Sequence, residues 1–159
     1  MPILNYTTQV GSAKSIAEIT GILSQFGART ITTEYDDNDY ISGLSFVIMV
    51  ENLPLAIRLP CNVEGVYKKI VYAKGVPRRL QTKEQARNVA WRILKDWLEA
   101  QLALFQVGQA DAAQVLMPYA VDNEGRTAYE MFRESHLRQL PPAPDNVVEG
   151  NFQAVAEQS

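Results

Sequence analysis

The fold of this chain is decided by residues 44–59, LSFVIMVENLPLAIRL, in which two alternating apolar runs flank a two-residue turn. Apolar side chains recur at every second position over residues 44–50 and again over 53–59, which is the period of a strand with one buried face. Residues 51–52 separate the runs, so we predict an antiparallel hairpin. Pro54 has no backbone N–H to donate, which places the second strand at an edge of the sheet.

Helix and strand patterns surround this hairpin. Capping-box spacings predict a helix over residues 15–26, with Ser15 as its N-cap, and a long helix over residues 82–107. The apolar arc of the long helix is so wide that we expect it to lie between the sheet and the C-terminal third of the chain. Residues 29–35 and 3–10 have the composition of strands.

These elements predict an α+β fold, with an antiparallel sheet of three or four strands and both main helices on one of its faces. Short C-terminal helices are expected to pack on the long helix. We expect a single domain over residues 1–140, with a sheet-and-helix part over 1–72 and a helical part over 82–140. Residues 141–159 are rich in proline and polar side chains, which predicts a flexible tail.

The composition is that of an ordinary soluble globular protein, with 47% hydrophobic and 21% charged residues. No apolar stretch approaches the ~20 residues that span a bilayer, and the N-terminal residues lack the pattern of a secretory signal. We therefore expect a cytoplasmic protein without a membrane partner. One cysteine, Cys61, and one histidine, His136, exclude an intrachain disulfide and a Cys/His zinc site.

Positive charge is concentrated in one segment. Nine of the fifteen Lys and Arg residues lie between Lys68 and Lys95, where Glu84 is the one acid, although the net charge of the chain is −3. At the expected start of the long helix, cationic side chains and free backbone N–H groups both favour an anion. The candidate anion-binding residues are Lys74, Arg78, Arg79, Lys83 and Arg87. A solvated basic face, a phosphate-bearing ligand and an acidic protein surface all fit this pattern.

Groups suited to catalysis are few. His136 lies late in the last expected helix, so we expect an exposed helix residue rather than a general base. No phosphate-binding loop, dinucleotide fingerprint or zinc-protease motif occurs. The acids between Glu34 and Asp39 either bind a divalent cation or form a solvated turn, and Cys61 is expected to be a small buried side chain rather than a reactive thiol. We therefore expect no cofactor and no metal, and a binding protein rather than an enzyme; a metal-dependent enzyme that uses these acids is a further alternative.

Several stretches resemble a group of small phage and prophage proteins of uncharacterised function. They are VPRRL at 76–80, EQA at 84–86, VAWRILKDWLEAQLAL at 89–104, LMPYA at 116–120 and GRTAYE at 125–130. The likeness runs over most of residues 5–135. It implies a phage-derived accessory protein in the bacterial cytoplasm, and it says little about activity.

The expected order of a helix, three strands and a second helix is also similar to that of a double-stranded-RNA-binding domain. In that family the last helix begins with lysines that touch RNA phosphates, and Lys83 and Arg87 match this basic start. Before the long helix, the chain inserts a short helix that Asn62 can cap and a basic connector that includes residues 74–79. It departs from the family in these insertions, in its long extension to Val107, and in lacking a glycine-rich lead into a lysine pair.

We therefore expect a phage-derived, non-enzymatic accessory protein that binds a phosphate-bearing partner, most simply nucleic acid, through the basic segment. The alternative is an interaction protein that inhibits a host defence system by binding a host protein or a nucleotide signal. The apolar arc of the long helix also suggests a homodimer. No base-reading pattern is evident, because Trp91 and Trp97 lie in apolar stripes and are expected in the core.

Overall fold

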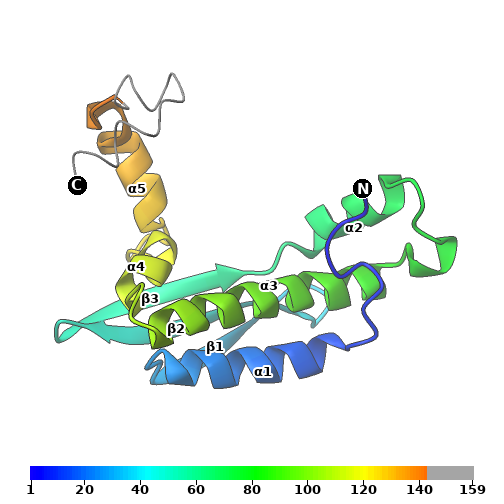
Figure 1. Cartoon of the computed structure of the whole chain (residues 1–159), viewed down its shortest axis with the longest axis horizontal. Coiled ribbons are helices and arrows are strands. Elements are labelled where there is room, and N and C mark those ends of the chain that lie inside the picture. Colours follow the sequence, from blue (N-terminus) through cyan, green and yellow to red (C-terminus); the bar gives the residue numbers. More distant parts are fainter. Residues whose placement is uncertain (143–159) are drawn as a thin grey trace, which may run out of the picture. The chain divides into compact units, whose positions relative to one another are not determined.

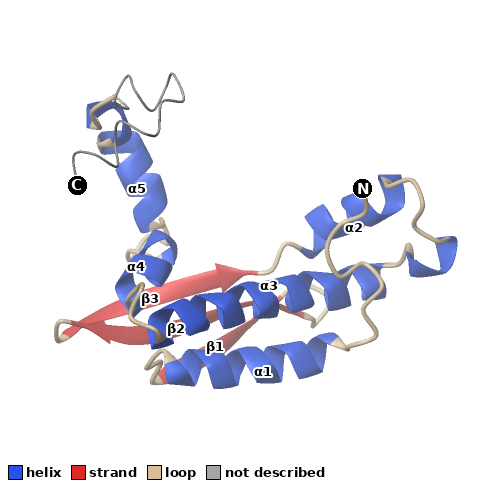
Figure 2. Cartoon of the chain, viewed as in Figure 1, coloured by secondary structure: helices blue, strands red, loops and turns tan. Residues whose placement is uncertain are grey.

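Two helices lie over one face of a three-stranded antiparallel sheet in the computed structural model, which describes residues 1–142 (Figures 1 and 2). The strands, in the spatial order β1-β2-β3, are β1 (Thr30–Tyr35), β2 (Ile41–Val50) and β3 (Leu53–Pro60). The helices on this face are α1 (Ser12–Gln25) and α3 (Lys83–Gln106). The other elements are α2 (Val63–Tyr72), α4 (Ala112–Leu116), α5 (Ala128–Ser135) and the 3₁₀ helices η1 (Arg78–Leu80), η2 (Met117–Tyr119) and η3 (Leu137–Gln139). The predicted α+β class is confirmed.

The chain divides into two units, residues 1–129 and 130–159, and α5 spans the division. The first unit contains the sheet and α1 to α4. The second contributes residues 130–135 of α5 and all of η3 to the described residues. The expected domain limit at residue 140 stays a prediction, and the expected tail, apart from its first two residues, lies outside the described residues.

The β2–β3 hairpin has the predicted register. Val50 pairs with Leu53 across the turn, and the two turn residues, Glu51 and Asn52, have φ values of 48° and 68°. Positive φ at both central positions is the geometry of a type I′ turn, whose twist matches that of the flanking strands. The edge position predicted from Pro54 is confirmed, since β3 ends the strand order.

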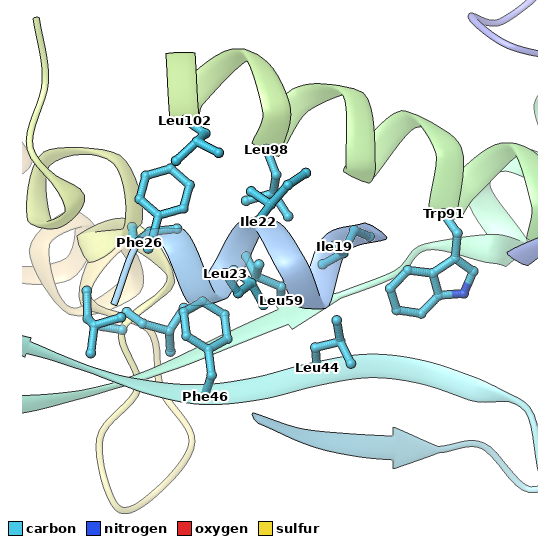
Figure 3. Close-up of a cluster of buried hydrophobic side chains, with 14 residues drawn as sticks. Ile19, Ile22, Leu23, Phe26, Leu44, Phe46, Leu59, Trp91, Leu98 and Leu102 are labelled. Atoms are coloured by element: carbon cyan, nitrogen blue, oxygen red, sulfur yellow. The ribbon is translucent and has the colours of Figure 1, made fainter. Parts of the chain in front are cut away.

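The core lies between the sheet and helices α1 and α3 (Figure 3). Its least exposed large side chains come from α1, from the sheet and from α3, and they include Ile19, Leu23, Leu44, Ile48, Ile57, Leu59, Trp91 and Leu98. Each such side chain contributes about 1.5–3 kcal/mol when it leaves water. The core position predicted for Trp91 is confirmed, because its exposed fraction is 0%.

Helix α3 is covered on two sides, as the width of its apolar arc predicted. Its first half packs on α2 in a second apolar cluster that contains Ile70, Val76, Ala86 and Val89. Farther along, the half-buried Trp97 meets the ring of Tyr119, with 5.6 Å between ring centroids. The C-terminal third was expected to cover α3. It covers only part of this helix, and α2 covers another part. Ala100, assigned to an apolar stripe, is exposed.

The strand expected over residues 3–10 is absent. Asn5 has a φ of 62°, and the chain forms consecutive turns instead. The side chain of Gln85 on α3 donates to the carbonyl oxygens of Tyr6 and Thr8, at 2.9 and 3.0 Å. A tertiary side-chain contact thus satisfies carbonyl groups that a strand would have paired with a neighbouring strand.

Helix α1 begins at Ser12 rather than at Ser15. The backbone N–H of Ser12 donates to Oδ1 of Asn88 on α3, at 2.9 Å, so a side chain from another helix takes the place of a local cap. Ser15 is fully buried within the helix, and its predicted role as N-cap is wrong. The predicted stop after this helix is confirmed by Gly27, which has a φ of 92°.

The edge of β3 is partly covered by the segment after η2. Ile57 forms an antiparallel bridge with Ala120, and the N–H of Val121 donates to the carbonyl of Ala56 at 2.9 Å. This short pairing is the nearest approach to a fourth strand within residues 1–142, and it protects an edge that would otherwise expose unpaired backbone groups.

Candidate functional site

The connector between α2 and α3 is held in place on both sides of its arginine pair. Val76 is buried, Leu80 is half-buried, and Gln81 donates from its side chain to the carbonyl of Val76 at 3.0 Å. Arg78 and Arg79 lie between these anchors and are exposed. Because the backbone on either side is fixed, the two guanidinium groups are presented to solvent from a defined position.

Five cations on α2 and the connector have no ion-pair partner within residues 1–142. They are Lys68, Lys69, Lys74, Arg78 and Arg79, and we call them the basic end. All five are exposed, and α2 and the connector lie together at one end of the first unit (Figure 1). Glu64 is the single acid between residues 62 and 82, and it is bound by Lys83. The hydrogen bond from Lys83 holds the pKa of the Glu64 carboxyl below its usual value, and the charge of Lys68, which forms no salt bridge with Glu64, contributes less.

Two of the predicted site residues have partners inside the fold. Lys83 pairs with Glu64 and lies 4.4 Å from the ring centroid of Tyr67. The guanidinium of the half-buried Arg87 lies 3.4 Å from the ring centroid of Tyr40. Cation–π contacts of this kind are favourable by about 0.5–2 kcal/mol. Lys74, Arg78 and Arg79 are the members of the predicted set that remain unpaired, while Lys83 and Arg87 join α3 to α2 and to the β1–β2 turn.

Lys68 and Lys69 were counted in the basic segment but were not placed in the predicted site. They line one hollow together with Gly65 and Tyr72 of the same helix. The spacing of three and four residues between these positions is the sequence pattern that could have identified this helix face. This hollow has a volume of about 670 Å³. Its lining is Met1, Ile3, Gly65, Lys68, Lys69, Tyr72 and Ala73.

Glu34, in β1 just before the β1–β2 turn, has structural partners. Arg58 on β3 lies 2.8 Å from the carboxylate of Glu34 on β1, and the hydroxyl of Ser45 donates to the same carboxylate at 2.5 Å. The hydrogen bond from Arg58 lowers the pKa of Glu34. Gly43 of β2 leaves room for this crossing, because a Cβ there would lie 3.1 Å from the Leu59 carbonyl oxygen and 3.4 Å from the Glu34 carboxylate.

Asp36 forms the turn itself, which supports the simpler interpretation of the acidic cluster. One of its carboxylate oxygens accepts the N–H groups of Asn38 and Tyr40, at 2.9 and 3.0 Å. This is the usual way in which aspartate stabilises a turn. Within residues 1–142, no group of three or more His, Cys, Asp or Glu side chains is placed to hold a metal ion.

His136 is exposed, as predicted, and lies 2.6 Å from the hydroxyl of Ser135 through Nδ1. The same hydroxyl lies 2.6 Å from the carbonyl oxygen of Met131, which can only accept a proton. The Ser135 hydroxyl can donate to Met131, and the tautomer of the imidazole decides which atom donates between that hydroxyl and Nδ1.

Cys61 lines a second hollow, of about 370 Å³, together with Trp97 and Tyr119. The thiol is half-buried, and burial raises its pKa to about 12. It is therefore protonated at neutral pH, whereas the thiolate is the reactive form. The expectation of an unreactive side chain agrees with this environment.

Comparisons with protein-family models, with curated proteins and with solved structures found no match to this chain. The resemblance to phage proteins, and the bacterial cytoplasm that it implies, stay predictions. The order α1-β1-β2-β3 before α3 is the one expected from the RNA-binding resemblance, but element order alone does not establish a function. None of the helices within the described part of the chain is long and apolar enough to cross a membrane.

Proposed function

We propose that this protein binds nucleic acid through the sugar-phosphate backbone, using the basic end. The observation that carries the proposal is the set of five exposed cations without an ion-pair partner within residues 1–142, in a chain whose net charge is −3. Their position is specific. Farther along the same basic segment, Arg92 and Lys95 are paired with Glu18 and Glu99.

The charges of this surface are of one sign, which favours a ligand-binding surface over a merely solvated face. Surfaces that serve solubility intersperse both signs, whereas the acid nearest in sequence, Glu64, is already bound by Lys83. Arg78 and Arg79 lie on a connector anchored by buried Val76, so binding orders little additional backbone. The guanidinium group also matches phosphate oxygens in a bidentate geometry.

Salt dependence tests the proposal directly. Fluorescence anisotropy would be measured with a labelled single strand and a labelled duplex over a series of salt concentrations. Each phosphate contact contributes about −0.9 for a duplex, or about −0.7 for a single strand, to the slope of log K against log salt. Contacts from all five cations therefore give a slope near −3.5 to −4.5. No binding to either probe at low salt and micromolar protein, or a slope of zero, would overturn the proposal.

An acidic polypeptide is the matched competitor in this experiment. If polyglutamate displaces the strand at equal charge concentration, the basic end recognises charge without preference for phosphate, and the proposal of a nucleic-acid-binding protein is wrong. If the strand remains bound, the phosphate preference is supported. This arm separates the proposal from the alternative of a surface for a host protein.

A further inference from the structure

An exposed tyrosine lies among the lysines of the basic end. The side chain of Tyr72, at the last position of α2, is one of the most exposed large side chains of the chain, with 83% of its surface accessible. Other tyrosines of this part of the fold have partners: Tyr67 lies beneath Lys83, Tyr40 beneath Arg87, and Tyr119 against Trp97. Within residues 1–142, Tyr72 has no such ring or cation contact.

Tyr72 also lines the hollow of about 670 Å³ on the outer side of α2. This volume falls in the range of about 300–1,000 Å³ that is usual for sites of small organic ligands. Lys68 and Lys69 line the same hollow, one helical turn before the tyrosine. Gly65, a turn earlier, also lines the hollow, and its own Cβ position lies against the side chain of Asn62, 2.7 Å from Nδ2.

A flat aromatic ring beside ammonium groups suits a ligand that has both a flat π-face and negative charges close to it. Each base of an unpaired strand offers a π-face to an aromatic ring, and its phosphates lie one backbone unit away on either side. In a duplex the same faces are covered by neighbouring base pairs, so a tyrosine on a helix surface finds no face to stack on. We propose that the hollow takes an unpaired base of single-stranded nucleic acid against Tyr72, with the adjoining phosphates at Lys68 and Lys69. This inference rests on the nucleic-acid binding proposed above.

The test compares probes with and without bases. A labelled oligothymidine, a labelled abasic deoxyribose-phosphate strand of equal length and a labelled duplex would be titrated with the parent protein and with Tyr72→Ala, Tyr72→Phe and Tyr129→Ala. Tyr129 is the matched control, because it is exposed and lies outside the hollow. Circular dichroism melting would verify that each variant is folded.

We expect the parent to prefer oligothymidine over the abasic strand and over the duplex. Loss of one stacking contact should weaken oligothymidine binding about 5- to 140-fold in Tyr72→Ala and leave abasic-strand binding unchanged. Tyr72→Phe keeps the ring and should bind like the parent, as should Tyr129→Ala.

Two results would overturn the inference while leaving the proposed function in place: equal binding of the oligothymidine and abasic strands by the parent, or an oligothymidine affinity that Tyr72→Ala does not change. A preference for the duplex would do the same. Failure of the parent to bind any of the three probes would instead overturn the proposed function, and this inference with it.

Discussion

Arg92 donates from Nη1 to the Glu18 carboxylate at 2.8 Å, and this contact joins α3 to α1 beside the core. Lys95, which is only 7% exposed, lies 3.9 Å from the same carboxylate and 2.6 Å from that of Glu99. Two cations of the basic segment therefore belong to the fold rather than to its outer surface. Glu18 lies three residues after Ser15, at the second position of the predicted capping box, but it neutralises charge between two helices instead.

Removal of Glu18 should destabilise the protein more than removal of Glu99. Glu18→Ala leaves Arg92 without its interhelical partner in a partly buried position, at an expected cost of about 1–3 kcal/mol. Glu99→Ala removes an exposed carboxylate from the buried Lys95, but the Lys95 ammonium keeps Asp96 at 3.7 Å and Glu18 at 3.9 Å, so we expect a smaller loss. Urea unfolding of both variants at neutral pH measures the difference. Equal losses of unfolding free energy would show that the contact between Glu18 and Arg92 contributes no more to stability than the contact between Glu99 and Lys95.

The two tryptophans should differ in their contribution to stability. Trp91 is fully enclosed, so Trp91→Ala should cost about 3–5 kcal/mol, enough to unfold a marginal domain. Trp97 is half-buried against Tyr119, and Trp97→Ala should cost less. Thermal melting followed by circular dichroism tests this order. If Trp97→Ala melts at a lower temperature than Trp91→Ala, the assignment of the core along α3 is wrong.

The Glu34–Arg58 contact should make stability fall on the acid side. Arg58 lowers the folded-state pKa of Glu34 below its ordinary value of 4.5, so the ionised carboxylate favours the folded state. This contribution is complete above the ordinary value and is lost as the pH falls through the lowered folded value. The stability gap between the parent and Glu34→Gln should therefore be present at neutral pH, shrink as the pH falls below 4.5 and close below the lowered folded-state pKa.

Urea midpoints over a pH series measure this gap, and Arg58→Gln supplies the control. In an Arg58→Gln background the Glu34→Gln substitution should change the pH dependence much less, because the main group that lowers the pKa is gone. A pH-dependent gap that persists at full size in this background would assign the lowered pKa to the hydrogen bond from Ser45 instead of to Arg58.

Cys61 should react slowly with thiol reagents while the protein is folded. Burial raises the pKa of its thiol to about 12, so little thiolate is present at pH 8. Reaction with an aromatic disulfide reagent should be much slower in buffer than in denaturing urea, where the thiol regains its ordinary pKa. Equal rates would mean that the hollow beside Trp97 admits the reagent and stabilises the thiolate.

The sequence predicted those parts of the fold that depend on local patterns. Alternation along β2 and β3 needs no partner to be recognised, and neither does the cap that Thr82 provides for α3, where its hydroxyl accepts the N–H of Gln85. The predictions were wrong where the backbone conformation depends on a side chain that is far away in the sequence. Gln85 binds the carbonyls of residues 6 and 8, and Asn88 caps α1, and both contacts join segments more than seventy positions apart.

The candidate site was only partly predictable for the same reason. Charge density alone identified the segment that contains Arg78 and Arg79. It did not reveal that Lys83 is bound by Glu64, 19 residues earlier, because that contact exists only after α2 packs on α3. Nor did it reveal the exposure of Tyr72, since an aromatic residue at helical spacing reads equally well as part of the core.

Reversal of the connector arginines should weaken nucleic-acid binding without disturbing the fold. Arg78→Glu with Arg79→Glu changes two exposed positions, and such substitutions usually alter stability by less than about 0.5 kcal/mol each. Affinity for a labelled strand should fall most at low salt, where screening is weakest. The slope of log K against log salt should become shallower by about 1.4–1.8, as expected for two lost phosphate contacts.

The matched control reverses two cations elsewhere on the same unit. Lys14 on α1 and Arg29 before β1 are exposed, so Lys14→Glu with Arg29→Glu changes the net charge by the same amount as the connector variant. If binding depends on the position of the charge, the control should retain nearly the parent's salt slope, because no phosphate contact is removed. If both double variants lose affinity equally at low salt, the parent responds to total charge alone, and the basic end is not the binding surface.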